Sequence, residues 1–299
     1  MDTNQISEKR NMKLAYLIMA HGSYELLKEL LKALDSPDND IYVHLDLKAG
    51  NVDVSPFYGV IRYSKLRFIE NRVNVKWGHI SIVEATLNLF EEAVKGDYDY
   101  LNLLSGVDFP IKSNSYIQKF FQAHQGKEFV GFSKELNLED VKNRTAWKPF
   151  RRRDYSGKYR VLGWVNGLVI RLQKFFHIYT LSPIHQIRQG AAWYSITRQL
   201  AAEVVTQRKT ILRRFKHVLL PDEMFLQTFI YEHHYMDRVF NVNDEFTSCC
   251  RYIDWHRGNP YVWQEEDIED LLQSQYLWAR KFSEENMNLI RKISESISS

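Results

Sequence analysis

Several residue patterns that would assign a function directly are missing from this 299-residue chain. Neither glycine-rich phosphate-binding pattern, GxGxxG or GxxxxGKS/T, occurs, which disfavours a dinucleotide-dependent enzyme and a P-loop nucleotide hydrolase. No run approaches the ~18–20 uncharged apolar residues of a membrane span, and the polar start MDTNQISEKRNMK has no signal-peptide core. These absences predict an intracellular, cytoplasmic protein.

Cysteine and net charge are also scarce. Cys249 and Cys250 are the only cysteines, and adjacent cysteines rarely form a disulfide. Neither has a histidine-spaced partner, so a zinc site is disfavoured and two packed, reduced thiols are expected. A formal net charge of +3 is too small to predict nucleic acid as a partner.

The composition is that of a folded chain, with 44% hydrophobic and 26% charged residues. A chain of this length can bury a sizeable core. Without internal repeats or low-complexity linkers, we expect a single domain over 13–283. A polar tail (1–12) precedes this domain and a C-terminal helix (284–299) follows it.

Strand-like and helical stretches alternate along the chain. KLAYLIMA (13–20) predicts a buried strand, the leucine spacing of 24–34 predicts a helix capped by Ser23, and 41–45 predicts a second strand. This β-α-β unit is complete within about 35 residues, the size of a nucleotide-binding half-unit. Further strands are expected at 67–73, 98–104, 128–132, 190–196 and 247–255. Further helices are expected at 81–94, 114–122, 197–207, 224–231, 267–273, 276–282 and 284–297.

The stretch YDYLNLLSGVDFPIKS (98–113) is expected to form the central strand, around which the other elements are arranged. An apolar strand passes abruptly into small, acidic and basic residues, and Pro110 cannot donate a ladder hydrogen bond. Open α/β sheets place ligands just past the carboxyl ends of their strands, so a ligand site is one interpretation. An ordinary loop in which Asp108 caps a helix is the other.

A basic and aromatic segment over 143–178 interrupts the regular pattern. Such a stretch can lie on an anionic membrane surface, frame an acceptor cleft, or cover the sheet with its charged ends outward. We favour the covering role.

A set of motifs in fixed order resembles the family of core-2/I-branching β-1,6-N-acetylglucosaminyltransferases, which includes the peptide O-xylosyltransferases. The resemblance runs from about residue 13 to 283. The matching motifs are HGSYELLKELL (21–31), IYVHLDLK (41–48), VKWGHISIVEATLNLF (75–90), YLNLLSGVDFPIKS (100–113), AAWYSITRQ (191–199), LLPDEMFLQT (219–228), RYIDW (251–255) and WARKF (278–282). The region 133–190 departs most from the family, and 143–190 is treated as a variable acceptor- or membrane-facing insertion.

The resemblance implies a GT-A-like, Rossmann-type α/β fold with a mixed central sheet between helices. It implies inverting transfer of a sugar, GlcNAc first, from a UDP-sugar to a hydroxyl of a glycan or lipid-linked glycan, without a metal or other cofactor. Golgi members carry a membrane anchor and several disulfides. The chain therefore resembles a bacterial, cytosolic member for surface polysaccharide synthesis, with peripheral membrane contact as one option.

The resemblance also assigns chemistry to individual residues. Inversion requires one carboxylate to deprotonate the attacking hydroxyl. The family's catalytic glutamate matches Glu223 of PDEMFLQT, beside Asp222 as a substrate contact, although acidic residues in a first helical turn are often caps. The leaving UDP requires fixed cations. Lys281 matches one of them, Arg280 is its neighbour, and Arg251 or Arg257 is the second candidate, with solvated surface charge as the alternative for each.

The remaining expected contacts surround the donor and acceptor. We expect the first turn and the end of the second strand to face the nucleoside, Asp108 and Lys112 to lie near the sugars, and aromatic rings to stack on sugar faces. Core packing is the alternative for the rings and for the strand histidine. The residues are His21, Ser23, His44, Asp46, Asp108, Lys112, Trp77, Trp193 and Tyr194.

Three other functions compete with this interpretation. A transferase for UDP-xylose or another UDP-hexose would share the same base. A nucleotide-sugar-binding protein without catalysis would have lost residues such as Glu223 and Lys281, which are present. A nucleic-acid binder would need a continuous basic face.

Overall fold

A computed structural model describes residues 11–134, 138–145, 167–169, 171–173, 175–176 and 186–298. Most of the N-terminal tail and most of the basic, aromatic segment lie outside the described residues, and with that segment the expected membrane contact. Within the described ranges, no helix is both long and apolar enough to cross a bilayer.

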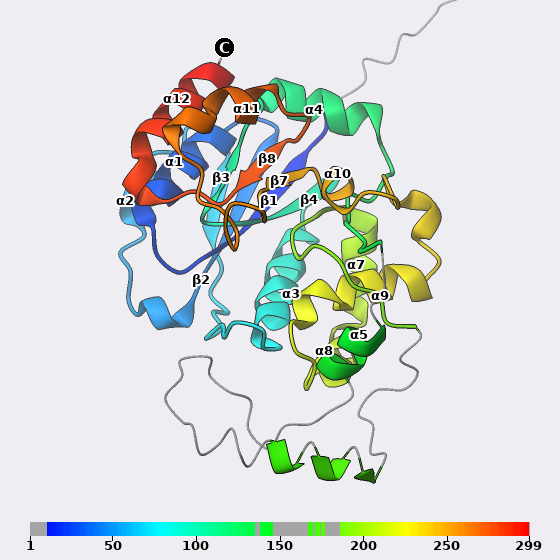
Figure 1. Ribbon diagram of the computed structural model, residues 1–299. Coiled ribbons are helices and arrows are strands. Elements are labelled where there is room, and N and C mark those ends of the chain that lie inside the picture. The colour runs from blue at the N-terminus through cyan, green and yellow to red at the C-terminus, as the bar shows by residue number, and fades with distance from the viewer. Residues whose placement is uncertain are drawn as a thin grey trace, which may run out of the picture.

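The centre of the molecule is a five-stranded sheet in the order β3-β2-β1-β4-β6 (Figure 1). Four strands are parallel, and β6 runs antiparallel to β4. The strands are β1 (Leu14–Ala20), β2 (Asn39–Leu45), β3 (Lys65–Phe68), β4 (Tyr100–Ser105) and β6 (Ser195–Thr197). This mixed sheet, flanked by helices, confirms the predicted α/β fold class.

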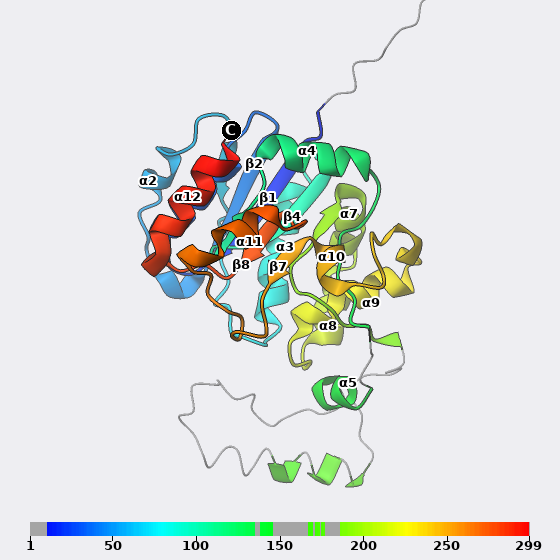
Figure 2. The ribbon, with the colours of Figure 1, turned by 45° about the horizontal axis from the view of Figure 1, so that its top comes forward.

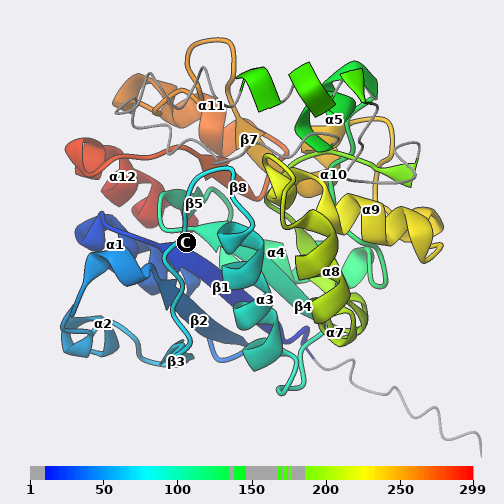
Figure 3. The same ribbon diagram turned by 90° about the horizontal axis from the view of Figure 1, so that it is seen from below.

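Alternate side chains of β1 enter two different cores because successive residues of a strand point to opposite faces. Leu14, Tyr16 and Ile18 pack on one side with α1 (Tyr24–Leu34), α4 (Asn114–Ala123), α11 (Ile268–Gln273) and α12 (Met287–Ile297). Ala15 and Leu17 pack on the other side with α3 (Ser81–Ala93), α7 (Arg198–Thr206), α8 (Arg208–Phe215) and α9 (Phe225–Glu232). Figure 3 shows α3 lying along the sheet beside α8.

The C-terminal helix α12 belongs to the first of these cores. Its Leu289, Ile290 and Ile293 are fully buried, and it packs against α1 and α11. Figure 2 shows α11 and α12 side by side over this face. The segment expected as a separate polar helix is therefore amphipathic and covers the sheet.

A second, three-stranded sheet has the order β5-β8-β7, with β5 (Asp108–Pro110), β7 (Arg251–Ile253) and β8 (Trp278–Arg280). The predicted helix at 276–282 is wrong, since its centre is strand β8. Trp278 and Ala279 are both fully buried, and such a short, doubly buried strand shows no alternation. Pro110 is accommodated because β5 is an edge strand.

Other boundaries also differ from the prediction. The expected strand at 247–255 divides into helix α10 (Glu245–Cys249) and β7, and 128–132 forms only isolated bridges, at Glu128 and Phe129. Ser23 has a φ of 53° and makes no side-chain cap, so its predicted capping role is wrong. Cys249 and Cys250 are free and buried, as predicted. The short elements not predicted are α2 (Ser55–Tyr58), α5 (Leu138–Thr145), α8, β5 and the 3-10 turns at Leu47–Ala49, Pro221–Glu223, Met236–Arg238 and Glu265–Asp267.

Candidate active site

The candidate site lies where the parallel strands end. The loops after β1, β2 and β4 meet there, because the Asp46 N–H donates to the Ala20 carbonyl at 2.8 Å and the Gly106 N–H to the Met19 carbonyl at 2.9 Å. A Cβ on Gly106 would lie 3.1 Å from the Ala20 Cβ, so the glycine permits this close approach. Such a convergence of strand ends is where α/β sheets bind ligands.

Arg280 is anchored at this edge by an ion pair with a buried carboxylate. Its Nη1 donates to Asp108 Oδ1 and to Ser105 Oγ, both at 2.7 Å, while Asp108 Oδ2 accepts the Ser105 N–H at 2.8 Å. Asp108 is 0% exposed. The expectation that Asp108 itself contacts the donor is therefore corrected: it orients Arg280.

Lys281 follows Arg280 at the end of β8. Its backbone is fixed, because the N–H donates to the Tyr261 carbonyl at 3.3 Å and the carbonyl accepts the Trp263 N–H at 3.0 Å. Its side chain is partly exposed, and within the described ranges no hydrogen bond or ion pair of its ammonium group is found. The backbone of Lys281 is thus held in place by two hydrogen bonds, and its ammonium group is available to bind an anion.

Glu223 ends a separate 3-10 turn, Pro221–Glu223, so its predicted place in the first turn of the following helix is wrong. Its Oε2 accepts a charge-assisted hydrogen bond from Arg144 Nη1 of α5 at 2.7 Å. The preceding Leu220 N–H donates to the Gly78 carbonyl at 3.1 Å. The carboxylate is therefore held between α5 and the loop that leads into α3.

Asp222 lies beside this carboxylate in a desolvated position. Burial, then the charge of Glu223, raises the pKa of Asp222 to about 7. Its Oδ1 is buried and has no hydrogen-bond partner among the described residues. The Tyr194 hydroxyl is buried and unpartnered there as well, and Asp222 helps to raise the pKa of that phenol. A fully buried Tyr194 cannot stack on a sugar, which corrects that expectation.

The segment 190–193 connects the acid to the cations. The Gly190 N–H donates to the Glu223 carbonyl at 2.9 Å, and the Arg280 guanidinium lies over the Trp193 ring at 4.9 Å from its centroid. Three residues of extended chain span about 10 Å at most. Glu223 and the Arg280–Lys281 pair consequently belong to one region of the molecule.

Three predicted cations or contacts have other partners. Arg251 is fully buried, and its guanidinium donates to the carbonyls of Leu103 and Tyr194 at 3.0 Å, so its expected diphosphate contact is corrected to a structural role. Arg257 pairs with two carboxylates, those of Asp254 and Asp267. Its guanidinium is thus already neutralised.

Lys112 lies toward the amino ends of the parallel strands, since the nearby Asn114 accepts a hydrogen bond from Asn39 at the start of β2. Its Nζ donates to the Leu272 carbonyl in the last turn of α11, and the adjacent Asn114 donates to Ala33 at the end of α1. The expected sugar contact of Lys112 is corrected to a helix C-cap.

The expected nucleoside contacts are divided between exposed and buried groups. His21 is exposed in the turn after β1, and Trp77 is 66% exposed. Asp46 is nearly buried and pairs with Lys48 at 3.3 Å. His44 is a core histidine, since its Nε2 accepts the Val73 N–H at 2.9 Å and burial lowers its pKa to about 4.

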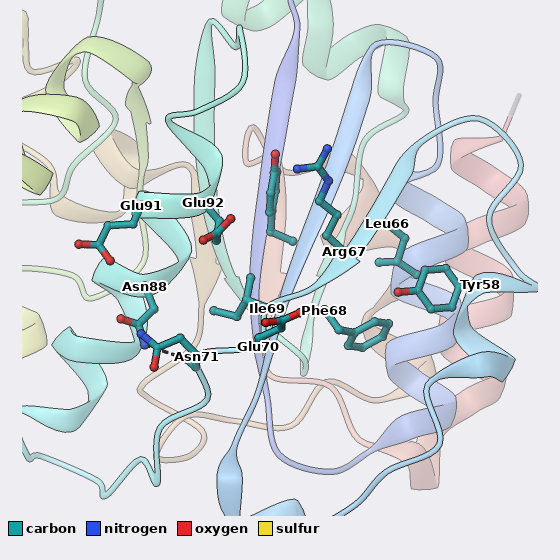
Figure 4. Close-up of a pocket in the computed structure, with 11 residues that line it drawn as sticks. Tyr58, Leu66, Arg67, Phe68, Ile69, Glu70, Asn71, Asn88, Glu91 and Glu92 are labelled. Atoms are coloured by element: carbon teal, nitrogen blue, oxygen red, sulfur yellow. Dashed lines mark hydrogen bonds between the residues drawn. The ribbon is translucent and has the colours of Figure 1, made fainter.

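A separate hollow of about 530 Å³ lies at the outer edge of the sheet, lined by β3 and α3 (Figure 4). Figure 4 shows Arg67 beside Leu66 on the β3 side and Glu91 and Glu92 on the helix side. None of the predicted site residues lines it. It is therefore distinct from the candidate site.

Two polar groups at the site were not predicted from sequence. Arg144 lies in the region that departs most from the family motifs, and Glu245 lies just before the stretch predicted as strand, 247–255. Neither has a local sequence signal. Among the described residues, no group of three or more His, Cys, Asp and Glu side chains is placed to hold a metal ion.

The fold and the site define an α/β protein with a carboxylate pair and two cations at the strand ends. The family model described as "Core-2/I-Branching enzyme" matches residues 14–278. The chain belongs to this family.

Individual relatives are about a quarter identical to the chain over the aligned residues. The human β-1,3-galactosyl-O-glycosyl-glycoprotein β-1,6-N-acetylglucosaminyltransferase is 24% identical, with 92% of this chain and 67% of that protein covered. The human N-acetyllactosaminide β-1,6-N-acetylglucosaminyl-transferase is 26% identical, with coverages of 92% and 69%. Xylosyltransferase oxt of Drosophila pseudoobscura pseudoobscura is 23% identical over 91% of this chain. The chain spans about a third of that protein's length, 32%.

Proposed function

We propose that the protein is an inverting glycosyltransferase that moves a sugar from a UDP-sugar to a hydroxyl of a glycan acceptor, and that GlcNAc is the sugar. The observation that carries the proposal is the joint placement of Glu223, Arg280 and Lys281 around segment 190–193. Family membership and relatives named as β-1,6-N-acetylglucosaminyltransferases support it.

Glu223 is the proposed general base. As the acceptor oxygen bonds to the anomeric carbon and the bond from that carbon to the diphosphate breaks, the hydroxyl proton passes to the Glu223 carboxylate. Arg144 donates to Oε2 of this carboxylate at 2.7 Å, which orients the base and favours its ionised form. UDP leaves from the opposite face, so the configuration inverts.

Arg280 and Lys281 are the proposed counter-charges for the departing diphosphate. Fixed cations stabilise negative charge that develops in the transition state and need not reorganise during the reaction. Asp108 and Ser105 fix Arg280, while Lys281 offers an unengaged ammonium group in the described part of the chain. We propose that these groups act without a metal ion.

Xylose is the second candidate for the transferred sugar, because xylosyltransferases of Drosophila melanogaster and Caenorhabditis elegans both match the chain at 22% identity. Thermal shift with UDP, UDP-GlcNAc, UDP-xylose, UDP-galactose and UDP-glucose compares the donors, since a ligand raises the melting temperature according to its affinity. We expect UDP and UDP-GlcNAc to stabilise most, with EDTA present. A preference for UDP-xylose would support the second candidate.

Substitution of the base separates binding from chemistry. Glu223→Gln should bind UDP within about two-fold of the parent affinity and lose about 10²–10⁴-fold in turnover, because general-base catalysis contributes that much. Release of UDP is measured with N-acetyllactosamine, 4-nitrophenyl β-galactoside and a serine-containing peptide as acceptors. Glu269→Gln on the exposed side of α11 is the matched control. Unchanged turnover in Glu223→Gln would refute the base, and loss of activity in EDTA would refute metal independence.

The place of action is proposed as well. We propose a cytoplasmic enzyme that acts on bacterial surface glycans, with peripheral contact at the inner face of the plasma membrane; two free, buried cysteines support a reducing compartment. Fractionation of cells that express the chain tests it: recovery in the cytoplasmic and peripheral membrane fractions is expected, and a secreted or integral protein contradicts it.

A further inference from the structure

Glu245 is a second half-buried glutamate close to the proposed base. It opens helix α10, and its Oε2 accepts a hydrogen bond from Ser133 Oγ at 3.3 Å. Burial raises its pKa, and the charges of Glu223 and Asp244 raise it further. No ion pair joins this carboxylate to a cation within the described ranges.

Two glycines bring Glu245 to the same place as Glu223. A Cβ on Gly190 would lie 2.0 Å from the Gly131 carbonyl oxygen, so these two backbones touch. Gly190 donates to the Glu223 carbonyl, and a Cβ on Gly131 would lie 2.6 Å from the Glu245 carbonyl oxygen and 2.8 Å from its Cγ. The Gly131–Gly190 backbone contact therefore lies against both glutamate residues, the main chain of Glu223 and the main chain and Cγ of Glu245.

The charged side chains near the Gly131–Gly190 contact indicate which substrate this part of the site binds. The proposed diphosphate cations, Arg280 and Lys281, lie beyond Trp193, whereas Glu223 and Glu245 lie at the glycine contact. Arg144 compensates Glu223, but Glu245 has no ion pair within the described residues and would repel a diphosphate, whereas sugar hydroxyls donate to carboxylate oxygens. The part of the site around Glu223 and Glu245 therefore suits the acceptor sugar, and the part around Arg280 and Lys281 suits the diphosphate.

We propose that Glu245, supported by Ser133, is an acceptor-binding residue that accepts hydrogen bonds from hydroxyls of an uncharged sugar ring next to the hydroxyl that Glu223 deprotonates. This inference rests on the proposed function and names the chemistry of its acceptor: a neutral, hydroxyl-bearing ring. Glu245 contributes to binding and orientation, and the proton still goes to Glu223.

Glu245→Gln and Glu245→Ala test the role by separating the two substrates. With the faster acceptor of N-acetyllactosamine and 4-nitrophenyl β-galactoside, both of which carry neutral sugar rings, the acceptor KM should rise about 10- to 100-fold, the effect of a lost hydrogen bond to a charged group. The KM for the UDP-sugar and its slow hydrolysis by water should stay within about two-fold, since neither uses the acceptor subsite. Glu269→Gln is the control for loss of one negative charge, and melting temperatures check folding.

The outcomes separate this inference from the proposed function. An unchanged acceptor KM in both Glu245 variants overturns the acceptor role, and equal rises of the donor and acceptor KM values show a structural effect instead. Preserved transfer and donor hydrolysis in Glu245→Gln keep the proposed function intact in either case. If the parent protein neither transfers nor hydrolyses any UDP-sugar, the proposed function itself fails.

Discussion

The pair of Asp108 and Arg280 shows how a single charged contact can shape a site. Asp108 has no exposed surface, so its charge is tolerated only because Arg280, Ser105 and the nearby Arg251 compensate for lost hydration. The pair fixes Arg280 at the end of β8 and directs Lys281, next in the chain, to the site. Asp108, which contacts no ligand, thereby positions Arg280 and Lys281, which are proposed to contact the diphosphate.

Replacing only Arg280 should lower the free energy of unfolding more than replacing both Asp108 and Arg280. Arg280→Met leaves a buried carboxylate without its closest cation, and we expect a loss of about 3–5 kcal/mol in the free energy of unfolding. The double variant Asp108→Asn/Arg280→Met should recover part of that loss, which urea denaturation of both singles and the double measures. Strict additivity of the two single effects would show that the pair is not coupled.

At the scale of elements, the decisive contact is the approach of the segments around Gly131 and Gly190. The chain before β6 and the bridge-forming stretch after α4 meet without side chains between them. Glu223 and Glu245 are carried by two other elements, the 3-10 turn and α10, that rest on this contact. The spacing of the two acids is therefore a property of backbone packing.

Gly190→Ala should disturb both stability and the site. Its Cβ would lie 2.0 Å from the Gly131 carbonyl, so the segments must separate, and we expect a loss of about 1–3 kcal/mol or more in unfolding free energy. Turnover should fall further than stability explains, because the Gly190 N–H holds the Glu223 carbonyl.

Gly22→Ala supplies the matched stability control, measured in the same urea titration. A Cβ there meets nothing within 4 Å, so its unfolding free energy should change by no more than about 0.5 kcal/mol. Equal stability losses at the two glycines would contradict the packing argument.

At the scale of the whole molecule, two sheets share one buried polar centre. Arg251 of β7 donates to the carbonyls of Leu103 in β4 and of Tyr194 just before β6, and its guanidinium lies over Trp278 of β8 at 4.3 Å from the ring centroid. The small sheet is thus joined to the central sheet by hydrogen bonds and by apolar packing. This junction holds β8, and with it the cations, against the strand ends.

Buried acids should make the stability of the whole molecule depend on pH. Glu128 is 0% exposed, and burial raises its pKa to about 7 although Thr197 donates two hydrogen bonds to it. Between pH ~4.5 and ~7 the folded protein keeps a proton that the unfolded chain has released. Unfolding free energy should therefore fall as pH rises through this window, by at most about 1.4 kcal/mol per pH unit from this group.

Glu128→Gln tests this dependence by urea denaturation at several pH values. Glutamine keeps an acceptor oxygen for Thr197 but cannot ionise. The unfolding free energy of the variant should rise relative to that of the parent protein as pH increases from ~4.5 to ~7, and this difference should stay constant above pH ~7. Asp222, with a pKa raised to about 7, should leave a smaller slope of the same sign in the variant. A constant difference across this range would refute a buried, raised carboxyl at Glu128.

Strands β1, β2 and β4 were predictable from the sequence because each is a mostly apolar run of six or seven residues, and their helices because each has a helical spacing of apolar residues. Short, doubly buried strands such as β8 were mispredicted because they carry no such pattern. Motif position was enough to single out Glu223 and Lys281 as candidates for the site. Their places in the structure agree with a shared region.

Only the tertiary structure decided which charges face a ligand. Arg251 and Arg280 are both arginines in matching motifs, yet one is buried among backbone carbonyls and the other is anchored at the strand ends. Arg144 and Glu245 join Glu223 from distant parts of the chain, without any local signal. The physical reason is that burial, ion pairing and backbone contact depend on groups remote in sequence, and these are fixed only when the elements pack.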